Sequence, residues 1–463
     1  MLLKKIIILI FISFAFNFLN AQEAEQKSVA VTVYNNGFGV IKDVRSFDIN
    51  SGISQIALTD VAQFIDPTSV RIKLNGSVME QNYQYDLVNF YKVLGKYIDK
   101  DIQLIGAKSE LIEGKLLSVA GSQIVLKKKD GGLLMIPSTS QYLFNVSSLP
   151  EGLITKPTLI WKVNSPKAGK QDVEVAYQTT GLNWHAEYVA VLDQADKTID
   201  LNSWVSIENN SGATYKDAKL KLVAGNVNMA PTMKKEARYG VDYSLVEVQS
   251  ANAVPKPFAE KSFFEYHVYD LQRPTTLAQN ETKQISLFEA SDVKIDKKYI
   301  YESTINSGQN PKKVNVLIEF ENRKNNNLGM PMPKGKIRLY KADKESIEFI
   351  GEDNINHTPK DEKVKLNIGA AFDVTAEEVQ TASKQITYNV KEQSYKITLK
   401  NHKSENVTVE VQRQFDNNWE ITESSMEYKI QDARTITYQV PVKKDGETTL
   451  TFTVRYTTFG SVK

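Results

Sequence analysis

A two-residue alternation of apolar and polar side chains is the feature that most restricts the fold of this chain. In "SVAVTVY" (28–34), valine occupies every second position, so Val29, Val31 and Val33 share one face of an extended strand. The same rhythm returns in "QDVEVAYQT" and "WHAEYVAVLD", and it is most regular from about residue 384 onward. Because runs of this kind form sheets that must bury one face, we predict a mostly β protein.

Breaks in this rhythm suggest how the chain is organised. Residues 229–261 lose periodicity and contain three prolines, which is typical of an exposed loop. The predicted parts are a signal peptide (1–21), an N-terminal β domain (22–82), a helix plus small β-barrel of the SH3/Sm-like kind (83–150), a large central β-sandwich region (151–378, with the loop 229–261) and a C-terminal immunoglobulin-like β-sandwich module (379–463).

The first residues, "MLLKKIIILIFISFAFNFLNAQ", predict export. Two lysines precede an apolar run of about 14 residues, and the small residue Ala21 follows as the predicted cleavage point. The run is short for a membrane anchor, which needs about 20 apolar residues. No later run is apolar enough to span a bilayer, so we expect a periplasmic or extracellular protein without a transmembrane segment in its mature part.

The absence of cysteine removes several kinds of chemistry. With no cysteine, the chain has no disulfide, no thiolate nucleophile, no cysteine-ligated metal and no lipid-modified N-terminal cysteine, so it is not expected to be a lipoprotein. Loss of Lys4 and Lys5 with the signal peptide would lower the formal net charge from +2 to zero. A neutral chain gives no electrostatic reason to expect nucleic acid as a partner.

The stretch 83–150 offers two features that invite a functional interpretation. "YDLVNFYKVLGKYI" (85–98) has helical spacing at Val88, Tyr91, Leu94 and Ile98, which we interpret as a buried face rather than a sugar-stacking platform. Five short strands follow, and "DGG" predicts a hairpin turn. The triplet "KKK" (127–129) is compatible with RNA binding, but we interpret it as a lysine-protected edge strand.

The stretch "FIGEDNINHTPKDEKVKLNIGAAFDV" contains the densest group of acids around a histidine. A calcium loop needs oxygen ligands at close alternating positions, and a zinc peptidase needs two histidines on one helix; neither pattern is present. Pro359 favours a turn between two strands. We therefore predict a surface turn rather than a metal or acid–base site for Glu352, Asp353, His357, Asp361 and Glu362.

The four histidines lie in separate segments, and their convergence in space stays open. On the strand "LNWHAEYVAVLD", Trp184, Ala186, Tyr188 and Ala190 share one face, while His185 and Glu187 share the other and offer two metal ligands from one strand. A metal site would need further ligands from other segments. The four histidines are His185, His267, His357 and His402.

The sequence contains no recognisable motif of a catalytic nucleophile. The chain has no "GxSxG" elbow, no "SxxK" with its partner motifs and no phosphate-binding loop. We therefore expect no catalytic residue, no cofactor and no metal. A catalytic triad or a pair of carboxylates assembled from distant segments remains an open alternative.

Several longer strings resemble a known family. "VTVYNNGFGVIKDVRSFDINSGISQIALTDVAQFIDPTSVRIK" resembles the N-terminal domain of mucoidy-inhibitor-like bacterial envelope proteins. "YQTTGLNWHAEYVAVLD", "WVSIENNSGATYKDAKLKLVAGNV" and "GKIRLYKADKESIEFIGEDNINHTPKDEKVKLNIGAAFDV" resemble their C-terminal domain of unknown function. The small-barrel candidate replaces the coiled-coil insertion of some members. The resemblance implies no established activity and no site residues.

These observations favour an exported, non-enzymatic envelope protein that serves as a protein-interaction or structural module. Its partner would be another envelope protein or a glycan. Two alternatives remain. Export and the aromatic content of 10% are compatible with a glycan-binding or glycan-processing protein. A metal-dependent hydrolase would have to use His357, His185 and nearby acids.

Overall fold

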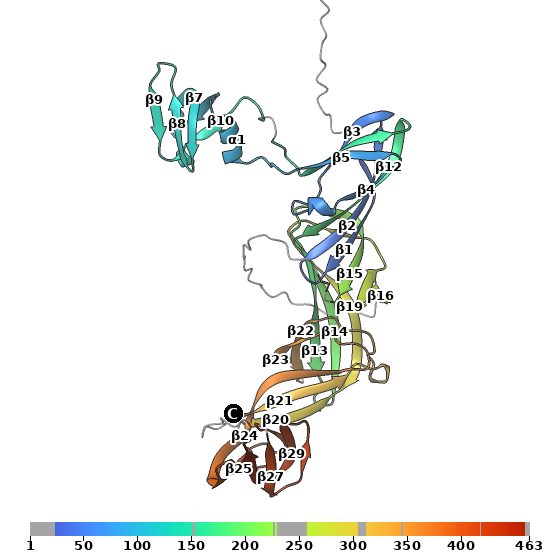
Figure 1. The fold of residues 1–463 in the computed structure, drawn as a ribbon, viewed down its shortest axis with the longest axis vertical. Helices are drawn as coiled ribbons and strands as arrows, with labels where there is room; N and C mark the ends of the chain where they lie inside the picture. Colours follow the sequence, from blue (N-terminus) through green and yellow to red (C-terminus); the bar gives the residue numbers. More distant parts are fainter. Residues whose placement is uncertain are drawn as a thin grey trace, which may run out of the picture.

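The computed structural model describes residues 24–150, 153–225, 227–228, 257–303, 312–343, 346–416 and 418–458 (Figure 1). Within these ranges, the regular structure comprises thirty β-strands, one α-helix and three short 3-10 helices, so the predicted mostly β class is confirmed. The predicted signal peptide with its cleavage after Ala21, and residues 229–256 of the predicted loop, lie outside the described residues. No helix in the described ranges combines the length and the apolar character needed to span a bilayer.

The first sheet, here called the N-terminal sheet, joins the beginning of the chain to much later segments. Its strands are β1 (Glu25–Tyr34), β2 (Phe38–Ile49), β4 (Arg71–Lys73), β12 (Gly169–Thr180), β15 (Tyr215–Ala224), β16 (Phe258–Phe263), β17 (Tyr266–Leu271) and β18 (Thr275–Leu277). They pair in the order β16-β17-β15-β1-β2-β12-β4, with β18 beside β15. β1 and β2 therefore lie in the middle of the sheet. As predicted, the alternating valines of β1 are buried.

A three-stranded sheet lies next to it, formed by β3 (Gly52–Thr59), β5 (Ser77–Gln84) and the central β11 (Thr158–Ser165). Trp161 of β11 is fully buried, and its indole N–H donates to Oε1 of Gln81 at 2.8 Å. The predicted boundary near residue 82 stays a prediction, but strands from both sides of it pair with each other.

The middle sheet pairs in the order β19-β14-β13-β22-β23. Its strands are β13 (Leu182–Leu192), β14 (Thr198–Asn209), β19 (Glu281–Lys294), β22 (Gly335–Ala342) and β23 (Ile347–Ile355). The predicted face of β13, which carries Trp184 and Tyr188, is buried. One continuous apolar core extends from Val29 to Leu366 and unites these three sheets.

The stretch 83–150 forms a small unit with its own core. It contains α1 (Phe90–Lys96), β6 (Asp101–Ile105), β7 (Leu111–Ala120), β8 (Gln123–Lys127), β9 (Leu133–Ile136), β10 (Leu143–Asn145) and the 3-10 helix η2 (Thr139–Gln141). The predicted helix and five strands are present. The strands pair as β10-β6-β7-β8-β9, and no pairing joins β9 to β10 among the described residues, so the sheet is open rather than a closed barrel.

The predicted buried face of the helix in this unit is only partly confirmed. α1 is shorter than 85–98, because Asn89 caps it and Tyr97 ends it. Leu94 is buried, but Val88, Tyr91 and Ile98 are exposed. Only about two turns form, which is too short for a stripe at helical spacing to face one core.

The predicted lysine-protected edge is wrong. Lys127 ends β8, and β8 pairs with β7 and β9, so it is an interior strand of the small sheet. Lys128 and Lys129 lie in the turn that follows, and Lys129 Nζ donates to Oε2 of Glu113 at 2.6 Å. This contact raises the pKa of Lys129.

The C-terminal sheet pairs in the order β27-β30-β25-β24-β21-β20-β26-β29-β28. Its strands are β20 (Asp296–Ser303), β21 (Lys312–Glu321), β24 (Lys363–Thr387), β25 (Val390–Asn401), β26 (Val407–Gln414), β27 (Trp419–Ser424), β28 (Tyr428–Ile430), β29 (Thr435–Val442) and β30 (Gly446–Thr457). The predicted immunoglobulin-like module thus shares its sheet with β20, β21 and β24, which begin earlier in the chain. β29 also lies close to β25 and β30, so the sheet folds over its own core.

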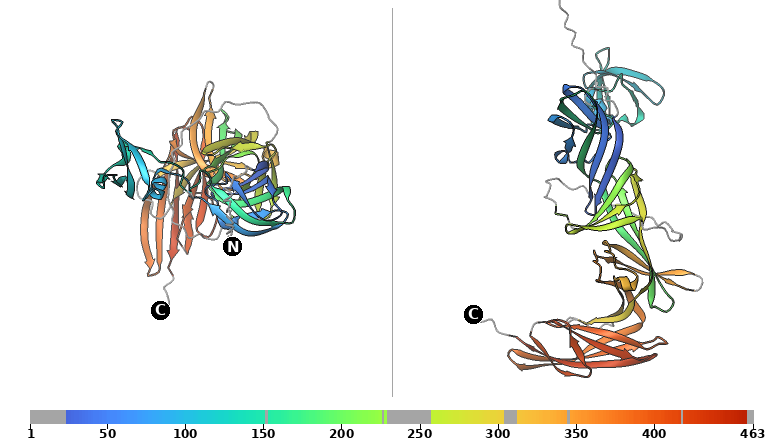
Figure 2. Two further views of the ribbon diagram at one scale, coloured as in Figure 1. Left: turned by 90° about the horizontal axis from the view of Figure 1, so that it is seen from above. Right: turned by 90° about the vertical axis from the view of Figure 1, so that its right-hand side faces the viewer.

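The sheets follow one another along an elongated molecule (Figure 1). The small unit stands to one side at the N-terminal end, and the C-terminal sheet lies across the long axis at the opposite end (Figure 2). The 3-10 helices η1 (Pro67–Ser69) and η3 (Lys324–Asn326) lie in connections between strands.

Candidate functional site

A sharp corner at Gly181 moves the chain from the N-terminal sheet into the middle sheet. β12 ends at Thr180 and β13 begins at Leu182. Gly181 has φ +81°, and a Cβ at this position would lie 2.6 Å from the carbonyl oxygen of Asn210. The amide N–H of Asn210 in turn donates to the carbonyl oxygen of Gly181 at 2.7 Å. Only glycine combines this backbone conformation with so close an approach.

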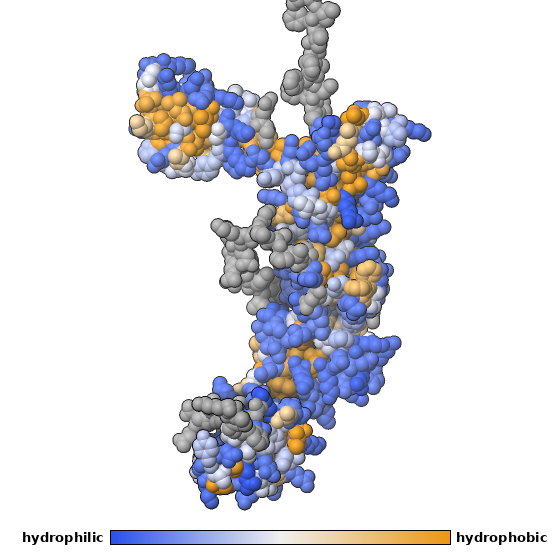
Figure 3. All heavy atoms as spheres, in the orientation of Figure 1, coloured by the Kyte–Doolittle hydropathy of each residue, from blue (hydrophilic) through white to orange (hydrophobic). Residues whose placement is uncertain are grey.

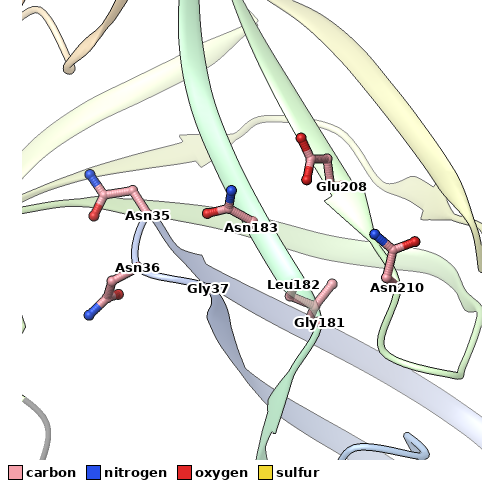
Figure 4. A pocket seen from close by; sticks show the side chains of 8 residues that line it. All are labelled: Asn35, Asn36, Gly37, Gly181, Leu182, Asn183, Glu208 and Asn210. Atoms are coloured by element: carbon pink, nitrogen blue, oxygen red, sulfur yellow. The ribbon is translucent and has the colours of Figure 1, made fainter. Parts of the chain in front are cut away.

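A polar pocket opens at this corner (Figure 4). Its volume is about 400 Å³, and three segments that are distant in sequence line it. The β1–β2 turn contributes Asn35, Asn36 and Gly37, and the corner contributes Gly181, Leu182 and Asn183. The end of β14 adds Glu208 and Asn210.

His357 fixes one wall of this pocket. The amide N–H of Lys334 donates to Nδ1 of His357 at 3.2 Å, so the ring proton belongs on Nε2. Nε2 lies 3.0 Å from Nδ2 of Asn35, and a 180° turn of this amide group would place its oxygen there as the acceptor of the Nε2 proton. Burial, Lys334 and His267 lower the pKa of His357, which keeps the ring neutral.

The β1–β2 turn is held on its other sides as well. Nδ2 of Asn36 donates to the carbonyl oxygen of Val227 at 3.3 Å. The rings of Tyr34 and Phe38 stack with centroids 4.3 Å apart, which brackets the turn. Gly39 permits Leu182 to pack against β2, because a Cβ there would lie 2.5 Å from its Cδ1. The pocket wall is therefore built before any ligand arrives.

Carboxylates and a histidine flank the opposite wall. Nδ1 of His185 lies 4.0 Å from Oε1 of Glu208, and its Nε2 lies 3.5 Å from Oε1 of Glu187. The contact with His185 lowers the pKa of Glu187 although burial raises it. Both acids and the histidine are partly exposed. His185 and Glu187, the possible metal ligands of this strand, thus lie close together, beside the pocket rather than within its lining.

The acid-rich segment around His357 is divided among separate partners. β23 and β24 flank a turn, as predicted, and a β-bridge joins Thr358 to Met332. Glu352 pairs with Lys336 at 3.1 Å. Oδ2 of Asp353 accepts from the amide N–H of Asn367 at 2.8 Å.

The two remaining acids of the segment, Asp361 and Glu362, serve the backbone turn. Asp361 has φ +67°, and its amide N–H donates to the carbonyl oxygen of Asn322 at 2.8 Å. The carbonyl oxygen of Glu362 accepts from the amide N–H of Asn322 at 2.8 Å. The segment therefore contributes His357 to the pocket wall, while the side chains of Glu352 and Asp353 bind other partners.

The histidines converge only in part. His267 pairs with Glu260 at 2.8 Å and is close enough to His357 to affect its pKa. His402 belongs to the C-terminal sheet region, where its amide N–H donates to the carbonyl oxygen of Asp373. Among the described residues, no three or more histidines and acids are grouped so that they could hold a metal ion.

The asparagines of the pocket were not found from the sequence. The string "NNG" at the β1–β2 turn supplies Asn35, Asn36 and Gly37. One sequence signal is an asparagine within two residues of a glycine in three strings, "YNNG", "TGLN" and "ENNSG", which all meet at the corner. Strand periodicity does not reveal this signal, because these residues lie where strands end.

The fold and this pocket define a class: a mostly β, multi-sheet protein with a polar pocket at the corner between two sheets. The family described as "Domain of unknown function (DUF4139)" matches residues 173–457, and the chain belongs to this family. The match covers the strings that resemble the C-terminal domain of unknown function. No curated protein matches the chain.

Proposed function

We propose that the chain is an exported, non-enzymatic protein of the bacterial cell envelope, of the mucoidy-inhibitor-like kind, and that it binds another envelope protein. The basic start, apolar run and small residue at Ala21 support export. The family match supports the C-terminal half of the resemblance. The proposed binding role rests on the exposed edge strands of the small unit.

The small sheet has two edge strands, β9 and β10, and both present apolar side chains to solvent. Leu133 and Met135 of β9 are 56% and 72% exposed, and Leu143 of β10 is 71% exposed. Within the described residues, β9 pairs only with β8, and β10 pairs only with β6. An unprotected apolar edge is a template for another strand.

Further apolar side chains lie beside both edge strands. Register places Ile105 between Leu143 and Leu111, and it places Val125 opposite Met135. Apolar atoms gather on the exposed side of this unit (Figure 3). Patches of this kind mark interaction sites. The occupant we propose is an extended segment of a different envelope protein that adds a strand to β9, with its side chains against Leu133 and Met135.

Methionine variants test this role. The tagged protein is crosslinked in intact cells and purified, and the captured partner is quantified by mass spectrometry. We expect Met135→Lys to lose a stoichiometric partner and Met79→Lys to retain it, since Met79 is an exposed methionine of β5 outside the small unit. Equal recovery with both variants would contradict the proposal, as would a capture that contains only further copies of this chain.

Export has its own test. The protein recovered from the envelope or the medium should begin at Gln22, as read by N-terminal peptide mass spectrometry. Recovery of the intact N-terminus from the cytoplasm alone would refute export.

A further inference from the structure

The pocket at Gly181 has the chemistry of a site for hydroxyl groups. Four of its eight lining residues are asparagines, and one is a glutamate. Each carboxamide presents a donor and an acceptor side by side, which matches a pair of neighbouring hydroxyls. In Figure 4, Asn183 lies between Asn35 and Glu208, and register places it directly opposite Glu208.

Two of these carboxamides are available to a ligand. Asn35 is held by His357 and Asn36 by Val227, as described above. The side chains of Asn183 and Asn210 make no hydrogen bond to another described residue. A fixed wall opposite available donors and acceptors lowers the cost of ordering the site when a ligand binds.

The charge of the lining argues for a neutral ligand. No lysine or arginine lines the pocket, so a phosphate or nucleic acid would find no counter-charge. Glu208 is the one carboxylate of the lining, whereas calcium sites combine several carboxylate and carbonyl oxygens.

The strands around the pocket argue against a peptide. β2, β12 and β14 are each paired on both sides. β13 pairs with β14 throughout but with β22 only from Ala186 onward, and Leu182 at its start packs against Gly39 of β2, so no open strand edge faces the pocket. Leu182 supplies the one apolar side chain of the lining, and it is buried. Peptide recognition relies on a strand edge or on apolar pockets, and this site presents neither.

We propose that this pocket binds a neutral saccharide through neighbouring hydroxyl groups, with Asn183 and Glu208 as the central contacts. Its volume of about 400 Å³ accommodates one or two sugar rings. In this arrangement Glu208 accepts from one hydroxyl while the carboxamide of Asn183 donates to the next. The proposal goes beyond the protein-binding role and does not depend on it.

An array of neutral oligosaccharides probed with the purified protein provides the test. The strongest binder is then titrated by NMR against the wild type and three variants. We expect Asn183→Ala and Glu208→Gln to weaken binding at least about fivefold, the loss of one hydrogen bond. Asn82→Ala, at an exposed asparagine of β5 outside the pocket, should leave affinity unchanged.

Three results would overturn the proposal: no binder on the array, a binder whose affinity is the same in Asn183→Ala and the wild type, or preferential binding of unrelated short peptides in the same titration. Circular dichroism of each variant confirms that the comparison is made between folded proteins.

Discussion

Nη1 of Arg413 lies 2.5 Å from Oε1 of Glu378, and both side chains are buried in the C-terminal sheet. Tyr301 and Ser303 donate to Oε2 of the same carboxylate at 2.9 and 2.7 Å. The guanidinium group lies 4.3 Å from the ring centroid of Tyr395. The two buried charges thus stabilise each other, and hydroxyl groups stabilise the carboxylate. Removing either charged group would leave the other one buried without a counter-charge.

Replacing Glu378 with Gln is therefore expected to destabilise the C-terminal sheet by about 3 kcal/mol, because Arg413 keeps its charge without a counter-charge. Hydrogen exchange in β24 and β25, followed by mass spectrometry, measures the loss. The matched control is Glu377→Gln, because the neighbouring Glu377 is half exposed and lies 3.9 Å from Lys400. It should change stability by no more than about 0.5 kcal/mol. Equal effects of the two variants would contradict the prediction.

A methyl group at Gly181 should disrupt the corner. Gly181→Ala places a Cβ against the carbonyl oxygen of Asn210 and also strains the backbone, so we expect a loss of about 2–4 kcal/mol. Gly52 has φ +79° with open space around it, so Gly52→Ala isolates the backbone contribution of about 1 kcal/mol. Urea denaturation compares the two. If both variants lose the same amount, the close contact is not what requires glycine.

The neutral state of His357 predicts a dependence on pH. In the unfolded chain its pKa is near 6.5, and in the folded protein it is lower. Below about pH 6.5 the unfolded state holds more protons, so stability falls as the pH drops toward the folded pKa. His357→Gln should flatten this decrease in melting temperature between about pH 7 and pH 5, relative to the wild type. A variant with the same slope as the wild type would show that other groups dominate.

Asp196, in the turn between β13 and β14, connects this turn to β20 and β22 by ion pairs. Its carboxylate accepts from Lys297 at 2.6 Å and also pairs with Lys341, and although burial raises its pKa, these lysines lower it overall. Asp196→Asn should cost about 1 kcal/mol at low salt and less at high salt, since all three side chains are partly exposed. Thermal melts at the two salt concentrations measure it. A loss that does not shrink with salt would argue against an electrostatic cause.

The fold class followed from the sequence, because a two-residue rhythm is local information. Leu399, Phe452 and Val454 alternate in sequence and are buried, as periodicity requires. Ile386 and Tyr388 alternate equally well, yet both are exposed near the end of the β24–β25 hairpin. Alternation shows which residues share a face of a strand; it does not show whether another layer covers that face.

The pocket illustrates what the sequence could not supply. Asn35, Asn183 and Asn210 come from three separate segments, and only the pairing of β2, β12, β13 and β14 brings them together. His357 joins them from a fourth segment, and its hydrogen-bond distance to Asn35 is not encoded in any local pattern. Pairing between distant strands depends on the whole chain, so no window of the sequence contained this site.

The family match begins at Val173, inside β12, whereas β1 and β2 lie between β12 and β15 in the N-terminal sheet. The boundary of the family match therefore differs from the boundary of the N-terminal sheet. A gene fragment cut at the start of the match would encode a sheet without its two central strands, leaving β12 and β15 with no neighbour between them. The segment that matches the family therefore needs the residues before it to complete the N-terminal sheet.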